Sequence, residues 1–402
     1  MNLDKVRLYY LSYNLYAFSS GLTSIFMSLF ILATASLVGV IYFNMFYYAG
    51  LEIALFACAY TLEFVTPKDL YIAGTIFRAV TLVAILFSAM IVSNPLLFGF
   101  IYGISIGTFF LGNNILLSDV SRGVDRKDFV YKNSLIGSIV ALFAPTIAGV
   151  LIEYSQFSGS LRFTYDFLAA FVMLVASAYF LWIANIKRPP RPIVFSIKDV
   201  VIRQKDYQDY KRYFLVYQLF YIPFSILLPV FVFQMTNSYT IAGIYGSLIL
   251  FITVFANYLV YIKNRYWRHY VKIFIAVTIA SSLLLLVPQL VSPLFAIFLF
   301  TAIYTLTSTP LNNQVTSNFL ELIDKSAKDR IHFWLNREVY LTLGRAIIFL
   351  VLAIALMEMK GSIYYFIYAL PPLSLYSLIY LRVSQREDDK TANKAVVTPL
   401  LK

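Results

Sequence analysis

Four charged side chains interrupt long apolar segments of this 402-residue chain, where burying a charge is costly and a functional reason is expected. They are Glu52, Arg78, Glu338 and Arg345. A carboxyl group in such a place can take up and release a proton, and a guanidinium group can bind an anionic part of a ligand. We therefore consider Glu52 as a proton carrier. Arg345 is considered as a contact for an anionic solute group or for a carboxylate.

Structural ion pairs are the alternative for the same charges. Glu52 and Arg78 lie in consecutive apolar segments, and at similar depth they would neutralise each other, which is the interpretation that we favour for them. Glu338 and Arg345 are seven residues apart and so share one face of a helix. Arg337 and Glu338 stand near the start of their segment, where they could form contacts of a gate.

The composition shows which elements must position these residues. The chain is 60% hydrophobic and 13% charged, whereas soluble domains carry about 25% charged residues, so it is a multi-pass membrane protein. A spanning helix needs about 20 mostly apolar residues. Windows of that size predict twelve spans, at residues 8–32, 37–64, 70–91, 95–118, 129–152, 165–185, 213–235, 241–262, 271–287, 293–316, 333–357 and 363–381.

Positive charge is concentrated on alternate connections between these spans. One set of connections and the two termini hold 28 of the 32 lysines and arginines, whereas the other set holds only Arg162 and Lys360. Because positive loops remain in the cytosol, both termini are predicted to be cytosolic. The net charge of +12 therefore indicates loop orientation rather than nucleic-acid binding.

The longest charged connection, residues 187–212, separates two similar halves. Short sequences recur in order in both halves, which predicts a duplicated six-span unit: residues 13–16 with 217–220, 36–39 with 240–243, and 113–114 with 312–313. Copies with the same topology are related by an axis along the membrane normal. We expect an N-terminal bundle at 1–186, a cytosolic linker at 187–212, a C-terminal bundle at 213–382 and a cytosolic tail at 383–402.

Twelve spans, a parallel repeat and a long central loop resemble the Major Facilitator Superfamily. Residues 144–149, Ala-Pro-Thr-Ile-Ala-Gly, are similar to a motif of its fifth span. In its loop between spans 2 and 3, Glu63 and Lys68 keep the acid and one base of the motif, and both of its glycines are lost. The resemblance implies an all-α membrane protein of two six-helix bundles related by a pseudo-twofold axis. These bundles would rock about a midplane site, so that access alternates between the two sides.

The resemblance also implies that spans 1, 4, 7 and 10 line the cavity. Polar and aromatic side chains follow one face of each of these spans, although such side chains also join helices by hydrogen bonds in any bundle. With Arg345 added, the expected solute-binding residues are Tyr13, Tyr16, Ser20, Tyr102, Asn113, Tyr217, Tyr221, Thr305, Ser308, Asn312 and Arg345. The expected cytosolic gate consists of Glu63, Lys68, Asp119 and Arg337.

The function expected from these features is secondary transport of a small solute by a monomer in the cell membrane, with proton coupling left open. A non-transporting scaffold or lipid-handling protein is the main alternative. A membrane-embedded enzyme is disfavoured, because it would need clustered His, Asp or Cys at a membrane face, and the charged cluster at residues 125–128 is on a short loop without metal-ligand spacing. One cysteine and two histidines supply no ligand set for a metal, and we expect no cofactor.

Overall fold

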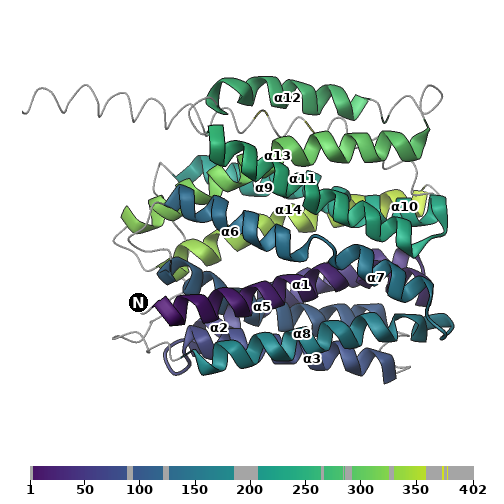
Figure 1. Cartoon of the computed structure of the whole chain (residues 1–402), viewed down its shortest axis with the longest axis horizontal. Helices are drawn as coiled ribbons and strands as arrows, with labels where there is room; N and C mark the ends of the chain where they lie inside the picture. The colour runs from purple at the N-terminus through teal and green to yellow at the C-terminus, as the bar shows by residue number, and fades with distance from the viewer. Residues whose placement is uncertain are drawn as a thin grey trace, which may run out of the picture.

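A computed structural model describes residues 3–87, 94–120, 126–184, 207–263, 267–283, 285, 292–325 and 330–358, together with Ser374 and Leu378. Within these ranges every regular element is a helix. Ten of the described segments are long and apolar enough to cross a membrane. Figure 1 shows the helices running side by side along one common direction, as a membrane-spanning bundle requires.

The helices before residue 185 follow the six spans predicted there. Their bounds are α1 Leu3–Thr34, α2 Leu37–Thr61, α3 Pro67–Phe87, α5 Pro95–Val120, α6 Arg126–Ala141, α7 Ala144–Glu153 and α8 Thr164–Ile183. The fifth predicted span is thus divided into α6 and α7, with Pro145 in the first turn of α7. Proline has no backbone N–H to donate to the preceding turn, so it is tolerated where a helix begins and not in its interior.

The helices after residue 206 cover five of the six spans predicted there. They are α9 Gln208–Ile222, a π-helical turn at Pro223–Leu227, α10 Leu228–Thr236, α11 Tyr239–Lys263, α12 Trp267–Leu283, α13 Pro293–Lys325 and α14 Arg330–Glu358. Helix α9 begins inside the predicted linker of residues 187–212. The twelfth predicted span, 363–381, lies outside the described residues except for Ser374 and Leu378.

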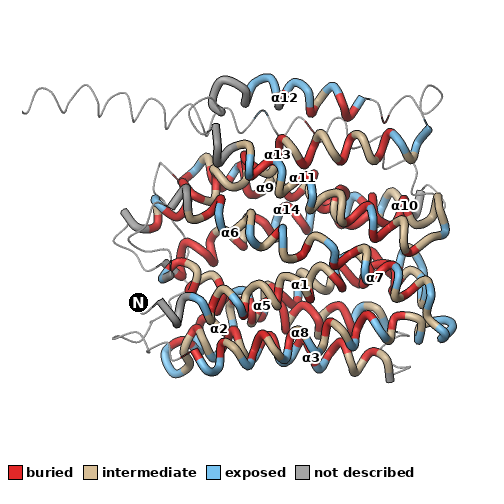
Figure 2. Tube along the Cα trace, in the orientation of Figure 1, coloured by how far each residue is buried: buried red, intermediate tan, exposed pale blue. Residues whose placement is uncertain are grey.

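Apolar packing holds each half together. Helix α1 packs against α8, and α2 and α3 both pack against α5, while α9 packs against α14 and α11 against α13. Large aromatic side chains such as Phe30, Phe167 and Phe220 are fully buried, whereas other large hydrophobic side chains such as Trp182 and Leu350 are exposed on the outside. Figure 2 shows buried and exposed positions interspersed along the helices. An apolar exterior suits hydrocarbon, which the outer face of a membrane protein contacts.

One interaction occurs in equivalent places in both halves. The Tyr9 hydroxyl donates a hydrogen bond to Asn113 Oδ1 at 3.1 Å, and the Tyr213 hydroxyl donates one to Asn312 Oδ1. Tyr9 stacks on the tyrosine four residues later, and Tyr213 does the same, at interplanar angles of 21° and 13°. The repeat predicted from the sequence is therefore accompanied by a matching pair of helix contacts.

The two halves meet along two groups of helix contacts. In one group α6 and α7 pack against α11, and α6 also packs against α13; in the other α2 packs against α14. In Figure 1 α6 and α7 lie between the group formed by α1, α2, α3, α5 and α8 and the group formed by α9 to α14. A Cβ atom at Gly149 would lie 2.4 Å from the Tyr239 carbonyl oxygen, and one at Gly243 would lie 2.3 Å from that of Pro145. Glycine is therefore required on both helices of this pair.

Candidate solute cavity

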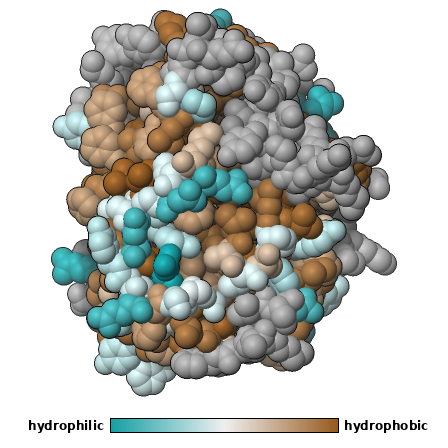
Figure 3. All heavy atoms as spheres, turned by 90° about the vertical axis from the view of Figure 1, so that its right-hand side faces the viewer, coloured by the Kyte–Doolittle hydropathy of each residue, from teal (hydrophilic) through white to brown (hydrophobic). Residues whose placement is uncertain are grey.

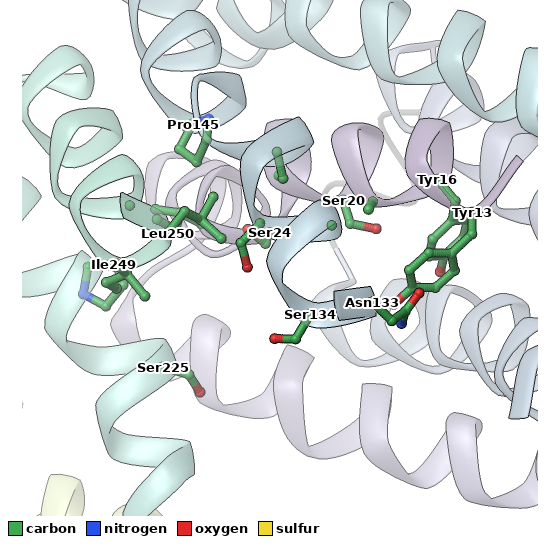
Figure 4. Close-up of a pocket in the computed structure, with 18 of the residues that line it drawn as sticks. Tyr13, Tyr16, Ser20, Ser24, Asn133, Ser134, Pro145, Ser225, Ile249 and Leu250 are labelled. Carbon is green, nitrogen blue, oxygen red and sulfur yellow. The ribbon is translucent and has the colours of Figure 1, made fainter. Parts of the chain in front are cut away.

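A cavity of about 560 Å³ lies between the two halves. Its wall comes from α1, α5, α6 and the start of α7 on one side, and from α9, α10, the π-helical turn and α11 on the other. Figure 4 shows Tyr13, Tyr16 and Ser20 toward one side of this space and Ile249 and Leu250 toward the other. The cavity therefore joins an aromatic and polar region to a more apolar one.

The wall is uncharged, since no Asp, Glu, Lys or Arg occurs among the described residues that line it. Hydroxyl and amide groups supply its polar atoms, and aromatic rings supply flat apolar surface. The polar members are Tyr13, Tyr16, Ser20, Ser24, Asn113, Asn133, Ser134, Ser138, Tyr221 and Ser225. Such a wall can bind a solute by hydrogen bonds and ring contacts, in a space of the size that small-molecule sites have.

The structure brings together five of the eleven expected solute-binding residues. Tyr13, Tyr16, Ser20, Asn113 and Tyr221 line the cavity. The other six are outside its wall: Tyr102, Tyr217, Thr305, Ser308, Asn312 and Arg345. Three of these six are on α13, which does not line this cavity. Residues of α6 and α11 line it instead.

The wall residues on α6 were missed because Ser134, Gly137, Ser138 and Ala141 were not distinguished from ordinary helix-packing residues. Their spacing places them on one helix face, and this row of small residues was the signal that could have revealed them. Gly137 leaves room in the cavity, since a Cβ there would meet only a Tyr13 ring carbon at 3.9 Å.

Arg78 lies just behind the cavity wall. It is 4% exposed, and it donates hydrogen bonds to Ser20 Oγ at 2.8 Å, to Thr23 Oγ1 at 2.8 Å and to the Tyr102 hydroxyl at 3.1 Å. Its guanidinium carbon lies 5.0 Å from the centre of the Tyr16 ring. Arg78 thus joins α3 to α1 and α5, and two residues that it contacts, Tyr16 and Ser20, line the cavity.

The expected ion pair between Glu52 and Arg78 is not formed. Glu52 Oε2 instead accepts a hydrogen bond from Thr342 Oγ1 at 2.9 Å, across the two halves. The helices α2 and α3 turn these two charges toward different neighbours, Glu52 toward α14 and Arg78 toward α1 and α5. Similar depth along two consecutive helices was therefore insufficient to predict a contact.

Glu52 belongs to a cluster of charges between α2 and α14. Arg345 Nη2 lies 3.6 Å from Glu338 Oε2, and its guanidinium carbon lies 4.5 Å from the centre of the Tyr48 ring. Arg337 Nη1 approaches Glu338 Oε1 at 3.3 Å. Three buried polar atoms of this cluster have no hydrogen-bond partner in the described structure: Glu52 Oε1 and the Nε and Nη1 atoms of Arg345. The cluster therefore contains unused hydrogen-bonding capacity at a junction of the halves.

The expected gate residues do not come together as a group. Lys68 Nζ donates to the carbonyl oxygens of Trp182 and Ala184, both at 2.8 Å, and so binds the end of α8 within its own half. Glu63 and Asp119 are exposed, and Arg337 contacts Glu338 in the α14 cluster. The gate therefore stays a prediction. The contacts of Lys68 do not favour a role in it, because they are made within one half of the molecule.

Other residues connect the halves at the end predicted to be cytosolic. The Tyr131 hydroxyl donates to the Pro310 carbonyl oxygen at 3.1 Å. Asn257 Nδ2 donates to Ser134 Oγ at 3.0 Å, and Asn257 Oδ1 accepts from Asn313 Nδ2 at 2.6 Å. These neutral hydrogen bonds join α6 to α11 and α13 where charged gate contacts were expected.

The opposite end of the molecule has its own contact between the halves. Glu153 Oε2, at the end of α7, accepts hydrogen bonds from Ser238 Oγ at 2.7 Å and from the Thr240 backbone N–H at 2.6 Å. The carboxylate thereby caps the N-terminus of α11, where the free N–H groups and the helix dipole favour a negative charge. Figure 3 views the molecule from this end, where hydrophilic side chains gather beside apolar ones.

A bundle of helices long and apolar enough to cross a membrane, with a solute-sized space inside it, is an architecture typical of transporters. The family model described as Major Facilitator Superfamily matches residues 9–328, and the chain belongs to this superfamily. The protein is therefore a secondary transporter and not an enzyme. No curated protein matches the sequence.

Solved structures of low sequence identity share the fold. The fucose:proton symporter FucP of E. coli is 14% identical, with a TM-score of 0.62 over 95% of this chain and 98% of that protein. A D-xylose-proton symporter is 12% identical, with a TM-score of 0.66 over 94% and 96% of the two chains. A bacterial homologue of the iron transporter ferroportin is 13% identical, with a TM-score of 0.61 over 95% and 99%.

Proposed function

We propose that the protein transports a small solute that binds in the cavity between α1, α5, α6 and α11 while the two halves rock about it. The main support for this proposal is that residues from both halves line one cavity of about 560 Å³. Contacts at both ends of the α6–α7–α11 junction support the proposal, because each must break and form again as access alternates.

The wall indicates what kind of solute fits. Hydroxyl and amide groups offer hydrogen bonds, and the rings of Tyr16, Phe109 and Phe224 offer apolar contact, so a compact solute with both characters is favoured. An uncharged wall disfavours a solute with several charges, because such a solute would lose its hydration without compensation. Sugars fit this description, and two proteins of similar fold are sugar symporters.

Filling the cavity tests the proposal. Gly137→Phe places a ring in the space, because Gly137 faces it and has room for a side chain. We expect this variant to fold but to lose solute-dependent thermal stabilisation, which for wild type is about 2.7 kcal/mol at a hundredfold excess over Kd. Ile139→Phe, on the exposed side of the same helix, is the matched control and is expected to bind normally. A solute that still stabilises Gly137→Phe fully would contradict the proposal.

Coupling to a proton at Glu52 is a further part of the proposal. The observation in its favour is the position of Glu52 at the α2–α14 junction, with one carboxylate oxygen bound to Thr342 and the other buried without a partner. Glu338 and Arg345 of α14 are the charged groups that face it. Proton binding there would change the charge of a contact that must rearrange during transport. Uptake into proteoliposomes with and without a pH gradient tests the coupling.

We also propose that the protein acts as a monomer in the cell membrane with both termini in the cytosol. The support is the distribution of Lys and Arg between alternate connections. Labelling of single cysteines introduced at Arg162 and at Lys394, in a Cys58→Ser background, tests the orientation. A membrane-impermeant reagent should label the first in intact cells and the second only after lysis.

A further inference from the structure

Arg78 is a buried cation beside the cavity whose partners are all neutral. We infer that the solute carries one carboxylate group, which binds at the α1–α5 end of the cavity to hydrogen-bond donors that Arg78 positions. This inference rests on the proposed function and adds the charge and orientation of the solute. Arg78 is the positioning residue, and Ser20 and Asn113 are the groups that would contact the carboxylate.

The charge balance is the first argument. All three guanidinium nitrogens of Arg78 donate to hydroxyl oxygens, those of Ser20, Thr23 and Tyr102. Among the described residues no carboxylate lies within ion-pair distance of it. A buried charge without an opposite charge is costly within a membrane. A carboxylate in the adjoining cavity would offset that cost, and only when the solute is bound.

The direction of the hydrogen bonds is the second argument. Ser20 Oγ accepts from Arg78, so the hydrogen of its hydroxyl group is available to an oxygen atom in the cavity. Asn113 Oδ1 accepts from the Tyr9 hydroxyl, so the amide nitrogen of Asn113 faces its surroundings as a donor. Both residues line the cavity. This end of the wall therefore offers hydrogen-bond donors. A carboxylate can accept hydrogen bonds from them, whereas an ammonium group can only donate.

The rings around Arg78 fix its position. Its guanidinium carbon lies 5.0 Å from the Tyr16 ring centre and 5.6 Å from that of Tyr102. Tyr16 in turn stacks on Phe109 with ring centroids 3.5 Å apart, so the cation cannot move away from Ser20 without disturbing the wall. In Figure 4 Ile249 and Leu250 stand at the other side of the cavity from Ser20. A monocarboxylate with an apolar tail would match both ends.

The test compares hexanoate and phenylacetate with their neutral amides, hexanamide and phenylacetamide. Binding to the purified full-length protein is measured by thermal unfolding, and uptake of the labelled carboxylate is measured in proteoliposomes. We expect a carboxylate to bind at least about tenfold more tightly than its amide. A site built of hydrogen-bond donors is left with unpaired donors when the ligand offers an amide, which is a weaker acceptor than a carboxylate. No binding of either carboxylate, or equal binding of the amides, would overturn the inference.

Two serines one helical turn apart provide matched variants. Ser20→Ala removes the donor that Arg78 positions, whereas Ser24→Ala removes a hydroxyl from the same wall without touching Arg78. We expect Ser20→Ala to lower the preference for carboxylate over amide by about fivefold and Ser24→Ala to change it by less than about twofold. Equal effects would overturn the inference. A purely structural role of Arg78 would lower the melting temperature and leave the preference unchanged.

Arg78 itself is tested by Arg78→Lys and Arg78→Met. Lysine keeps the charge and should retain part of the preference, and methionine should abolish it; if Arg78→Met does not fold, Ser20→Ala carries the test. Gly137→Phe separates this inference from the proposed function. If the solute is neutral and Gly137→Phe abolishes its binding, only the inference of a carboxylate group is overturned. If a solute still binds to Gly137→Phe, the proposed binding site is contradicted as well.

Discussion

The two junctions between the halves are built from different chemistry. At the α7–α11 junction Gly149 and Gly243 let the helix backbones touch, and Thr146 Oγ1 and Ser247 Oγ lie 2.8 Å apart as hydrogen-bond partners. At the α2–α14 junction Glu52, Glu338 and Arg345 meet, with buried polar atoms that have no partner in the described structure. The first junction is close-packed and neutral except for Glu153 at its end, and the second is charged and incompletely paired.

This difference indicates different tasks during transport. A close backbone contact depends on shape and can act as a pivot, because small residues allow a helix to turn against its neighbour without losing contact. A charge cluster depends on ionisation and distance, so a proton or a shift of one helix changes its energy strongly. We therefore expect substitutions at α7–α11 to act on packing, and those at α2–α14 to act on charge balance.

The largest effect is expected for Arg345→Met. This change removes the cation that pairs with Glu338 and acts on Glu52, and breaking a buried pair in this way costs about 3–5 kcal/mol. Thermal unfolding of the purified protein measures the loss. Arg337→Met, whose side chain is 28% exposed, is the control and should cost less. If Glu338→Gln does not restore part of the stability of Arg345→Met, the cluster is not held by charge.

A smaller effect is expected for Gly149→Leu at the other junction. The new side chain would start 2.4 Å from the Tyr239 carbonyl oxygen and would force α7 from α11, at a cost of about 1–3 kcal/mol. Uptake should be lost because the halves could no longer pack as they do. Val150→Leu, at an exposed neighbouring position, serves as the control for both stability and uptake. Normal uptake by Gly149→Leu would show that the backbone contact is dispensable.

Glu153→Gln should weaken the cap on α11 by about 0.5–1 kcal/mol, since a partly exposed carboxylate at a helix N-terminus contributes about that much. The measurement is a double-mutant cycle with Ser238→Ala, which removes one donor of the same contact. We expect the two effects to be less than additive, because both changes disrupt one interaction. Full additivity would indicate that the two residues act independently.

The smallest effect on stability, below about 0.5 kcal/mol, is expected for Glu52→Gln, which keeps an oxygen for Thr342 and removes a charge near Glu338. Uptake, in contrast, should no longer respond to a pH gradient if Glu52 carries the proton. Glu63→Gln, at an exposed carboxylate of the same half, should leave that response intact. Unchanged gradient-driven uptake by Glu52→Gln would assign Glu52 to structure alone.

The sequence by itself determined the elements and their repetition. Runs of about 20 apolar residues identify spanning helices because hydrocarbon excludes unpaired backbone groups, and this information is local. The same reasoning found the polar face of α1, where Tyr13, Tyr16 and Ser20 do line the cavity. It also related Asn113 to Asn312, which accept matching tyrosine hydrogen bonds.

Only the tertiary structure decided which faces meet. Glu52 and Thr342 are 290 positions apart in the chain, and no local pattern predicts that they are partners in place of Glu52 and Arg78. The wall likewise uses α6 and α11 instead of α13. Gly149 and Gly243, which bring α7 and α11 into backbone contact, are 94 positions apart in the chain. Helix identity follows from composition, whereas rotation and approach of helices follow from packing between distant residues.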